Sequence, residues 1–574
     1  MKKTLLLAAL ALTSLLGVAA INDTFVIDDL LYTVLTETET SKTVSVKAPE
    51  GDFTLSGNVV IPDSVTNNNI KYAVTQLPYG AFKYCSDITT ISLPETITTF
   101  DAGAFLHCSG ITAVNINENN PNFCSEEGVV YNKNMTSFIY CPNTKSGVFK
   151  IPETVTTIGR NAFLGCEKLT GIILPDNLTT IGNYCFEQCS SLTSIHLPQN
   201  AAISSSGDSP FGFCSSLEEI TVDSENATLS SVDGVLYNKN ITTLIQYPAA
   251  KKGVVSIPNT VTKLYNGCFS ECIELTTAHI SENLTTLTGM AFSHCVNLIN
   301  IEVDDANPSF CSIDGVLYTK DKTTLIAYPG GRTGEFTIPD FVTKLNGHSF
   351  RGAKLSALVI PVSISSIGIY AFNNCSNLTK IIDLNPTPQT IDLNSSIGTP
   401  ESLTVYVPKG CLDAYKQKWQ YFHNFEEIET FMVALSYTKD NLTVGESIKL
   451  TANIVSADKT NIEIASEVWS SSIPTVATVD QSGNISALSP GTTTITVTVT
   501  DKANNVRTDN CLVTVSPSSG VDIISADTTE FIDYSLPFEI FNLNGSKLGG
   551  SLTKLQPGVY ILRQNNKATK IVVK

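Results

Sequence analysis

One unit recurs along most of this chain and constrains its fold more than any other feature. The unit has the form small-Phe-x-x-Cys-x-x-Leu-x-x-Ile-x-Leu-Pro. It is clearest from Ala162 to Pro175 and, after a step of 23 residues, from Cys185 to Pro198. A unit this short cannot bury its apolar side alone, so successive copies must stack into a solenoid. Nine copies are recognised by their phenylalanines: Phe82, Phe105, Phe163, Phe186, Phe211, Phe269, Phe292, Phe350 and Phe372.

Three steps in this series are longer, because each contains one repeat plus an insertion of 35 residues. The insertions carry a Gly-Val-x-Tyr-x-Lys run, such as 234–239, and then a second β-rich run that ends in proline, such as 242–248. Two β-rich runs around a short polar turn predict a β-hairpin. Tyr131, Tyr237 and Tyr318 in these runs either pack the hairpin onto its coil, which we favour, or form a recognition edge.

The Phe-x-x-Cys-x-x-Leu units that alternate with these Asp-Gly-Val-Leu-Tyr hairpins resemble the BspA-type leucine-rich repeats of bacterial surface proteins. Residues 21–75 resemble the opening of such an array and residues 403–419 its closing cap, so the resemblance spans roughly 21–430. It implies non-enzymatic adhesion to host or bacterial extracellular proteins, to other cells or to glycans. The pattern departs at Ala353, where cysteine is missing, and after Cys375, where the strand ends in Asp383; we therefore expect an irregular last coil.

The period ends at about residue 430, and two further pieces follow. Residues 431–517 alternate β-runs with turn signals, as a β-sandwich requires, and resemble the bacterial Ig-like group 2 domain. Residues 518–574 are few for an independent core and resemble the C-terminal sorting domain of type IX secretion. That second resemblance implies contact with the secretion machinery through this tail, passage across the outer membrane and removal of the tail. The alternative is an ordinary terminal β-module. The expected fold class is all-β dominated: a leucine-rich repeat solenoid with β-hairpin insertions, an Ig-like sandwich and a small C-terminal β domain.

Residues 1–20 have two lysines, a short apolar stretch and a small-residue exit, which predict a signal peptide cleaved after Ala20. No second hydrophobic segment follows, so we expect no membrane span. The expected location is secreted or on the outer-membrane cell surface.

The charge and the absence of known motifs limit the classes of partner and cofactor that this chain can bind. Asp plus Glu outnumber Lys plus Arg by 54 to 36, and no basic cluster follows the N-terminal lysines. Nucleic acid is therefore an unsuitable partner, because phosphate binding needs clustered positive charge. The sequence contains no nucleotide-binding, zinc-protease or hydrolase motif, so we expect no catalytic residues, no cofactor and no metal site.

The high number of cysteines raises two hypotheses, a disulfide framework and a catalytic thiol. The total is fifteen, an odd number, and alanine fills the repeat slot once, so we interpret the slot as a place for a small buried thiol. The pairs His107-Cys108 and His294-Cys295 do not form a catalytic set in this interpretation, because other copies place unrelated residues in the histidine slot. Eight cysteines share the slot: Cys85, Cys108, Cys166, Cys189, Cys214, Cys272, Cys295 and Cys375.

The Ile-x-Leu alternation points two side chains of each copy inward and leaves the flanking positions outward. These outward positions form two rows of small, mostly neutral residues, so long-range charge steering of a ligand should be weak. We expect the rows to form a ligand-binding face, and the alternative is a stiff structural stalk of the envelope or matrix with no specific ligand. The candidate contact residues are Thr90, Ser92, Asn115, Ser194, His196, Glu219, Thr221, Thr277, His279, Asn300, Glu302 and Lys380. The same rows also contain Ala113, Gly171, Ile173, Ala357, Val359 and Ile382.

Overall fold

The structure is a computed structural model. It describes residues 21–573 apart from 50–54, 205–206, 393–394, 397, 429–430, 437–440, 456–461, 518–538, 542–546, 550–557 and 565–566. The expected signal peptide and its cleavage site at Ala20 lie outside the described residues. The chain divides into two compact units: Met1–Thr438 with Asn453–Ile462, and Lys439–Ala452 with Glu463–Lys574.

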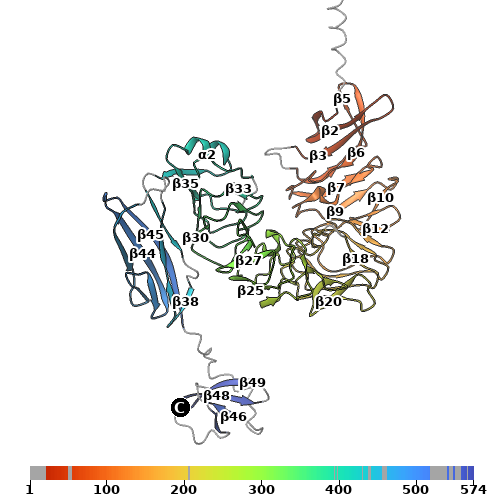
Figure 1. The fold of residues 1–574 in the computed structure, drawn as a ribbon. Coiled ribbons are helices and arrows are strands. Elements are labelled where there is room, and N and C mark those ends of the chain that lie inside the picture. The colour runs from red at the N-terminus through yellow and green to blue at the C-terminus, as the bar shows by residue number, and fades with distance from the viewer. Residues whose placement is uncertain are drawn as a thin grey trace, which may run out of the picture. The chain divides into compact units, whose positions relative to one another are not determined.

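The first unit is a solenoid in which each coil lays one strand beside the strand of the preceding coil (Figure 1). We call this parallel sheet the front sheet. Its inward residues are those predicted from the alternation; Ile195, for example, lies opposite Ile220, and both are buried. The front-sheet strands are β4 (Gly57–Val60), β7 (Ile88–Leu93), β9 (Ala113–Ile116), β13 (Gly147–Lys150), β15 (Leu169–Ile173), β17 (Ser194–Leu197), β19 (Glu219–Val222), β23 (Gly253–Ser256), β25 (Leu275–Ile280), β26 (Asn300–Val303), β30 (Glu335–Thr337), β32 (Ala357–Ile360), β34 (Lys380–Asp383), β35 (Thr404–Pro408) and β36 (Asn424–Ile428).

A second set of short strands, which we call the back sheet, lies on the return half of the coils. Two 3-10 turns, η1 (Ala102–Phe105) and η2 (Gly289–Phe292), precede the connection back to the front sheet. The back-sheet strands are β8 (Thr99–Phe100), β14 (Thr157–Ile158), β16 (Thr180–Ile181), β18 (Ala202–Ile203), β24 (Lys263–Leu264), β31 (Lys344–Leu345) and β33 (Ser366–Ile367).

Each insertion is a meander of three strands rather than the expected hairpin of two. The last two strands of each meander are those predicted, while the first was missed. In the first insertion, β10 and β11 meet at a two-residue turn, Glu127 and Gly128, whose positive φ angles of 48° and 81° are typical of a tight hairpin. The strands are β10 (Phe123–Glu126), β11 (Val129–Asn132) and β12 (Ser137–Tyr140); β20 (Leu229–Val232), β21 (Val235–Asn238) and β22 (Thr243–Gln246); and β27 (Phe310–Ile313), β28 (Val316–Thr319) and β29 (Thr324–Ala327).

The meanders interrupt the front sheet. The third strand of each one joins the back sheet, as β12 does by pairing in parallel with β14, whereas the front sheet starts again with a new strand. The front sheet is therefore four segments: β4-β7-β9, β13-β15-β17-β19, β23-β25-β26, and β30-β32-β34-β35-β36. Tyr131, Tyr237 and Tyr318 are buried, so these meander tyrosines pack the insertion onto its coil, as favoured above.

The core is a ladder of the repeat phenylalanines. Phe186 stacks between Phe163 and Phe211, with ring centroids 5.5 and 5.1 Å away. Beside this ladder seven of the eight slot cysteines are buried, and Cys85 is half-buried. Cys189 Sγ donates to the carbonyl oxygen of Phe163 in the preceding coil at 3.3 Å. Four more slot thiols make the same bond, so the slot selects a weak donor as well as a small side chain: Cys108, Cys214, Cys295 and Cys375. All fifteen cysteines are free thiols, including the eight of the repeat slot for which a thiol was expected.

The last repeat is regular at its strand, so the expectation of an irregular coil was wrong there. β34 pairs in register with β32 and with β35, and Asp383 lies opposite Ile360. Asp383 is fully buried, because it takes the inward position that leucine fills in other copies. Regular pairing continues because the backbone register does not depend on the chemistry of that side chain.

Two caps close the solenoid. The strands β1 (Thr24–Ile27), β2 (Leu30–Glu37), β3 (Lys42–Lys47), β6 (Ile70–Leu77) and β5 (Ser64–Asn67) pair in that order at the N-terminal end. At the other end α2 (Leu412–Lys418), labelled in Figure 1, is followed by the buried Trp419, whose indole N–H donates to Gln389 O at 2.9 Å. Beyond the cap, β37 (Met432–Ser436) returns to pair in parallel with β30.

The second unit contains the expected sandwich. Its sheets are β38-β45-β44-β41 and β39-β43-β42, and Trp469 is buried. The last four strands form one antiparallel sheet in the order β47-β46-β48-β49, in agreement with the expected small β domain. The strands of these sheets are β38 (Asn441–Thr443), β39 (Ser447–Lys449), β41 (Ile464–Ser471), β42 (Ala477–Val479), β43 (Asn484–Ala487), β44 (Gly491–Asp501), β45 (Val506–Ser516), β46 (Glu539–Phe541), β47 (Lys547–Gly549), β48 (Gly558–Gln564) and β49 (Lys567–Val573). The remaining strand, β40 (Thr451–Val455), instead follows β37 in the sheet of the fourth front-sheet segment.

Within the described part of the chain, no helix combines the length and the apolar character required to cross a bilayer.

Candidate ligand-binding face

All twelve candidate contact residues lie on front-sheet strands, on the side away from the phenylalanine ladder. They come from seven strands in all four segments. Their positions are Thr90 and Ser92 on β7, Asn115 on β9, Ser194 and His196 on β17, Glu219 and Thr221 on β19, Thr277 and His279 on β25, Asn300 and Glu302 on β26, and Lys380 on β34.

The side chains of this face pair across neighbouring strands. His196 lies opposite Thr221, and its Nδ1 is 3.0 Å from the threonine Oγ1. The same arrangement recurs one segment later, where His279 lies opposite Glu302. Cross-strand pairs of this kind fix the orientation of exposed side chains. The face therefore presents ordered polar groups in two places.

The two predicted rows are not continuous. The meanders separate Asn115 on β9 from the next strand, β13, and Thr221 on β19 from β23. The repeat spacing could not reveal these breaks, because the sequence motif resumes in phase after each insertion. The candidate face is therefore a series of separate patches, one for each front-sheet segment.

On the fourth segment the rows are covered. Val359 and Ile382 lie on the outward side of their strands, yet they are only 2% and 0% exposed, because Ile428 and Met432 pack against them. Lys380 Nζ lies 3.3 Å from Glu335 Oε1. The expected open surface at Val359 and Ile382 was thus wrong, since the chain after the cap folds back over them.

Sequence reasoning missed part of the exposed surface as well. Val60, Val148 and Val254 are 68%, 65% and 57% exposed, and each belongs to the first strand of a front-sheet segment. These strands precede the Phe-x-x-Cys motif and lack its leucine, so the motif search passed over them. The signal that could have found two of them is the repeated Gly-Val pair at the end of an insertion, at residues 147–148 and 253–254.

The histidine slot of the repeat is not a freely varied surface position in every copy. His294 Nδ1 lies 3.4 Å from Glu271 Oε1, and the side chain is only 16% exposed. Burial and, to a smaller extent, the nearby Arg351 guanidinium together lower the pKa of His294 to about 4. Arg351 also lies over the ring of Phe213, at 5.2 Å from its centroid.

These contacts leave the His294-Cys295 pair without the geometry of a nucleophile and its base. The thiol of Cys295 donates to Phe269 O at 3.0 Å, whereas the imidazole contacts Glu271. In the other pair, Cys108 donates to Phe82 O and His107 stacks on Tyr84. A catalytic thiol requires its base within hydrogen-bond reach, which neither pair provides.

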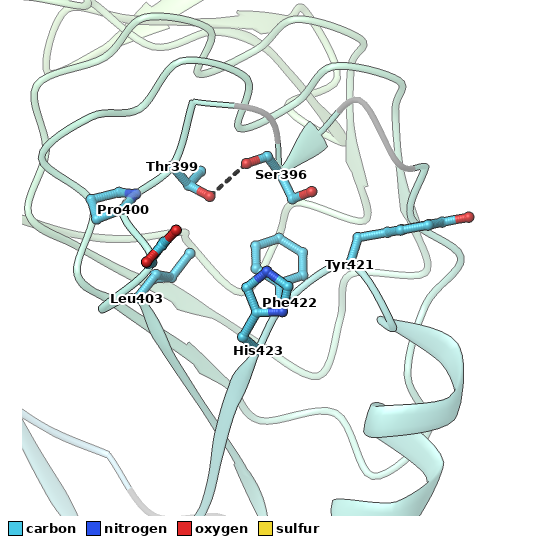
Figure 2. Close-up of a pocket in the computed structure, with 8 residues that line it drawn as sticks. Ser396, Thr399, Pro400, Leu403, Tyr421, Phe422 and His423 are labelled. Carbon is cyan, nitrogen blue, oxygen red and sulfur yellow. Dashed lines mark hydrogen bonds between the residues drawn. The ribbon is translucent and has the colours of Figure 1, made fainter. Parts of the chain in front are cut away.

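One pocket lies beside the C-terminal cap (Figure 2). It has a volume of about 110 Å³, and Thr399 Oγ1 donates to Ser396 O at 2.6 Å on one wall. The volume is little more than a third of the roughly 300 Å³ at which small-molecule sites begin. Its lining residues are Ser396, Thr399, Pro400, Glu401, Leu403, Tyr421, Phe422 and His423.

The described residues contain no group of three or more His, Cys, Asp or Glu side chains arranged to hold a metal ion.

Two family models match the sequence. The model of the BspA type leucine rich repeat region matches residues 40–136, 132–252, 247–313 and 330–433. The model of the bacterial Ig-like domain (group 2) matches residues 430–508.

The chain also resembles a known protein over part of its length. An uncharacterised protein of Clostridium acetobutylicum is 34% identical over 103 residues, which are 18% of this chain and 25% of that protein. The chain thus spans about a quarter of that relative's length.

Several solved structures share low identity with the chain. The pneumococcal vaccine antigen PcpA is 20% identical, with 72% of this chain and 100% of that chain covered and a TM-score of 0.35. A leucine rich cell surface protein of Faecalibacterium prausnitzii is 21% identical, with 71% and 94% covered and a TM-score of 0.30. A leucine-rich repeat protein of Bacteroides ovatus is 23% identical, with 71% and 100% covered and a TM-score of 0.24.

Proposed function

The chain belongs to the proteins built from the BspA type leucine rich repeat region, and from this premise we propose that it is a non-enzymatic binding protein of the cell surface or extracellular space. In this role the open front-sheet patches recognise host or bacterial extracellular proteins or glycans by surface area and shape. The Ig-like domain acts as a spacer in the same extracellular chain.

The observation that supports this proposal is the ordered polar front face of the second and third segments. His196 with Thr221 and His279 with Glu302 present donors and acceptors in fixed positions on an extended, uncovered sheet. Repeat proteins commonly use such extended surfaces for binding. The small pocket beside the cap offers no comparable area.

Export is part of the proposal. The signal-peptide pattern of residues 1–20 and the likeness of residues 518–574 to a type IX sorting domain both favour passage to the cell surface. The domain boundaries at residues 20, 430 and 517 belong to the same proposal. An exported product whose mass includes residues 555–574 would contradict the sorting role of the tail.

The test is a binding assay with the full chain on immobilised extracellular-matrix proteins and on a glycan array. We expect saturable binding that Thr221→Glu and His279→Glu weaken at least tenfold. The matched control is Thr180→Glu. Thr180 is exposed on the back sheet, so this substitution adds the same negative charge away from the front sheet. No saturable binding to either library would favour the stalk function, and binding unaffected by both front-face changes would reject this face.

A further inference from the structure

Three front-sheet strands occupy equivalent places, since β13, β23 and β30 each open a new segment directly after a meander. Each follows or begins with a glycine in the left-handed region: Gly147, Gly253 and Gly334, with φ angles of 75°, 83° and 78°. The next residues, Val148, Val254 and Glu335, are therefore equivalent. We call the side of each strand that faces away from its own segment the opening edge.

The opening edge of β30 is occupied. The chain's own strand β37 pairs with it in parallel, with Ser436 opposite Glu335. Val433 and Leu435 of that strand are buried, and Met432 packs against Val359 of the fourth segment. The pairing of β37 with β30 thus shows which kind of segment can bind at this edge. It is an extended segment with alternating buried apolar side chains.

The opening edge of β23 has no such occupant. Gly253 and Ile257 donate their backbone N–H groups toward β25, to Glu274 O at 2.9 Å and to His279 O at 3.0 Å. Successive residues of a strand direct their backbone groups to opposite sides, so Val254 and Ser256 present theirs to the opening edge. Among the described strands β25 alone is hydrogen-bonded to β23.

The side chains at this edge also suit a polypeptide. Val254 is 57% exposed, and β23 itself carries no charged residue. The two preceding lysines are engaged elsewhere, because Lys251 Nζ donates to Asp233 O at 2.7 Å and Lys252 Nζ lies 3.9 Å from Glu274 Oε2. An exposed, uncharged sheet edge is a template for strand addition unless something covers it.

The equivalent edge of β13 is protected by charge. Lys150 lies on this strand, and its ammonium group pairs with Glu153 at 3.1 Å with both side chains mostly exposed. A lysine on an edge strand disfavours addition of a further strand. β13 therefore provides a natural control for β23.

We propose that the opening edge of β23 accepts, in parallel register, an extended segment of a partner protein with alternating apolar side chains, as β30 accepts β37. This inference rests on the proposed binding function and specifies polypeptide rather than glycan as the partner of the third segment. Backbone hydrogen bonds to Val254 and Ser256 supply affinity, and an apolar side chain of the partner covers Val254.

The probe is a fluorescein-labelled peptide of the sequence of residues 431–436, Phe-Met-Val-Ala-Leu-Ser, with two lysines added for solubility, titrated into the full chain. We expect saturable binding and slower hydrogen exchange of the amides of Val254 and Ser256. A peptide with aspartate in place of the residues at Val433 and Leu435 should bind at least tenfold more weakly. Absence of binding by the parent peptide together with unchanged exchange at β23 would overturn the proposal.

The decisive variant is Val254→Pro, which removes the N–H at the opening edge and leaves the ladder to β25 in place. We expect at least a tenfold loss of peptide affinity, whereas Val148→Pro on β13 should leave it unchanged. If thermal unfolding shows that the proline variant is destabilised, Val254→Lys replaces it in this test. That variant keeps the backbone N–H and adds a charge at the edge. Equal binding to the parent chain and to Val254→Lys would reject the site.

Two further results separate this inference from the proposed function. In the first, Thr221→Glu weakens binding to matrix proteins or glycans, whereas Val254→Lys leaves the affinity for the peptide unchanged. This result would support the proposed function and reject strand addition at β23. Dimerisation of the full chain that Val254→Lys abolishes would assign the edge to a second copy and overturn the partner assignment.

Discussion

Phe186 and Phe211 stack with their ring centroids 5.1 Å apart and their planes only 11° apart, and this contact repeats between successive coils. Both side chains are fully buried. Phe186 therefore supports the coil before it, through Phe163, and the coil after it, through Phe211.

We predict that Phe186→Ala is severely destabilising. The change removes a buried ring that contacts two coils, and such truncations cost about 3–5 kcal/mol. Phe186→Leu should cost less, because most of the volume remains. Chemical unfolding of the first unit measures both. A loss below about 1 kcal/mol for the alanine variant would contradict the ladder as the main core contact.

The turn of the first meander offers a separate test of steric contact. A Cβ on Gly128 would lie 2.6 Å from Ala113 Cα, and φ there is 81°. The matched control is Gly147, with φ of 75° and open space around it. Both alanine substitutions place a side chain in the left-handed backbone region, which costs about 1–2 kcal/mol. Gly128→Ala should lower the free energy of unfolding more than Gly147→Ala does, because β9 must also move away from the new Cβ. Equal losses in unfolding free energy would show that the turn does not press on β9.

Asp383 should make stability depend on pH. Burial raises its pKa to about 7, while hydrogen bonds from neighbouring groups oppose the shift in part. Because the folded state holds the proton more tightly than the unfolded state, stability conferred by the protonated acid is present at low pH and is lost as pH rises through about 7.

We therefore predict that the unfolding free energy falls between about pH 4 and pH 8, by at most about 4 kcal/mol if this group acts alone. Asp383→Asn should remove most of that slope, because the amide stays neutral. The measurement is urea unfolding at several pH values. A variant with the same pH slope as the parent chain would show that another group is responsible.

Thiol labelling tests the cysteine ladder. Burial raises the pKa of Cys214 and of Cys375 to about 12, and both thiols donate to backbone carbonyls. Iodoacetamide at pH 8 should therefore label the folded chain only at the half-buried thiols, and all fifteen should react in guanidinium chloride. Intact-mass analysis counts the adducts. Fewer than fifteen in denaturant without reductant would reveal a disulfide. The half-buried thiols are Cys85, Cys124, Cys311 and Cys411.

The sequence allowed prediction of those parts of the fold that repeat locally. The positions of Ile195 and Leu197 relative to Phe186 determine where a strand begins and which side is buried, and the copies confirm one another. The opening strands β13 and β23 escaped prediction because they lack the motif. The covering of Val359 by the chain near Met432, and the meeting of Phe213 with Arg351, depend on contacts between distant residues that no local pattern encodes.

The candidate face could be predicted residue by residue but not as a surface. Ser194, His196, Glu219 and Thr221 lie side by side as the alternation requires. Their separation from Thr277 and from Asn115 arises from the meanders, whose effect on the front sheet is a matter of hydrogen bonding rather than of spacing.

Each meander ends one front-sheet segment and precedes the next, and this arrangement has a consequence for evolution. At the first meander its own residues make contacts on both sides: β12 joins β14 on one side, and Gly128 closes onto Ala113 on the other. A gene segment that encodes one meander with its following coils can therefore be duplicated or lost without disturbing the pairing of the stacks that remain. We therefore expect homologous chains to differ in length by whole modules, each of which brings one more opening edge with it.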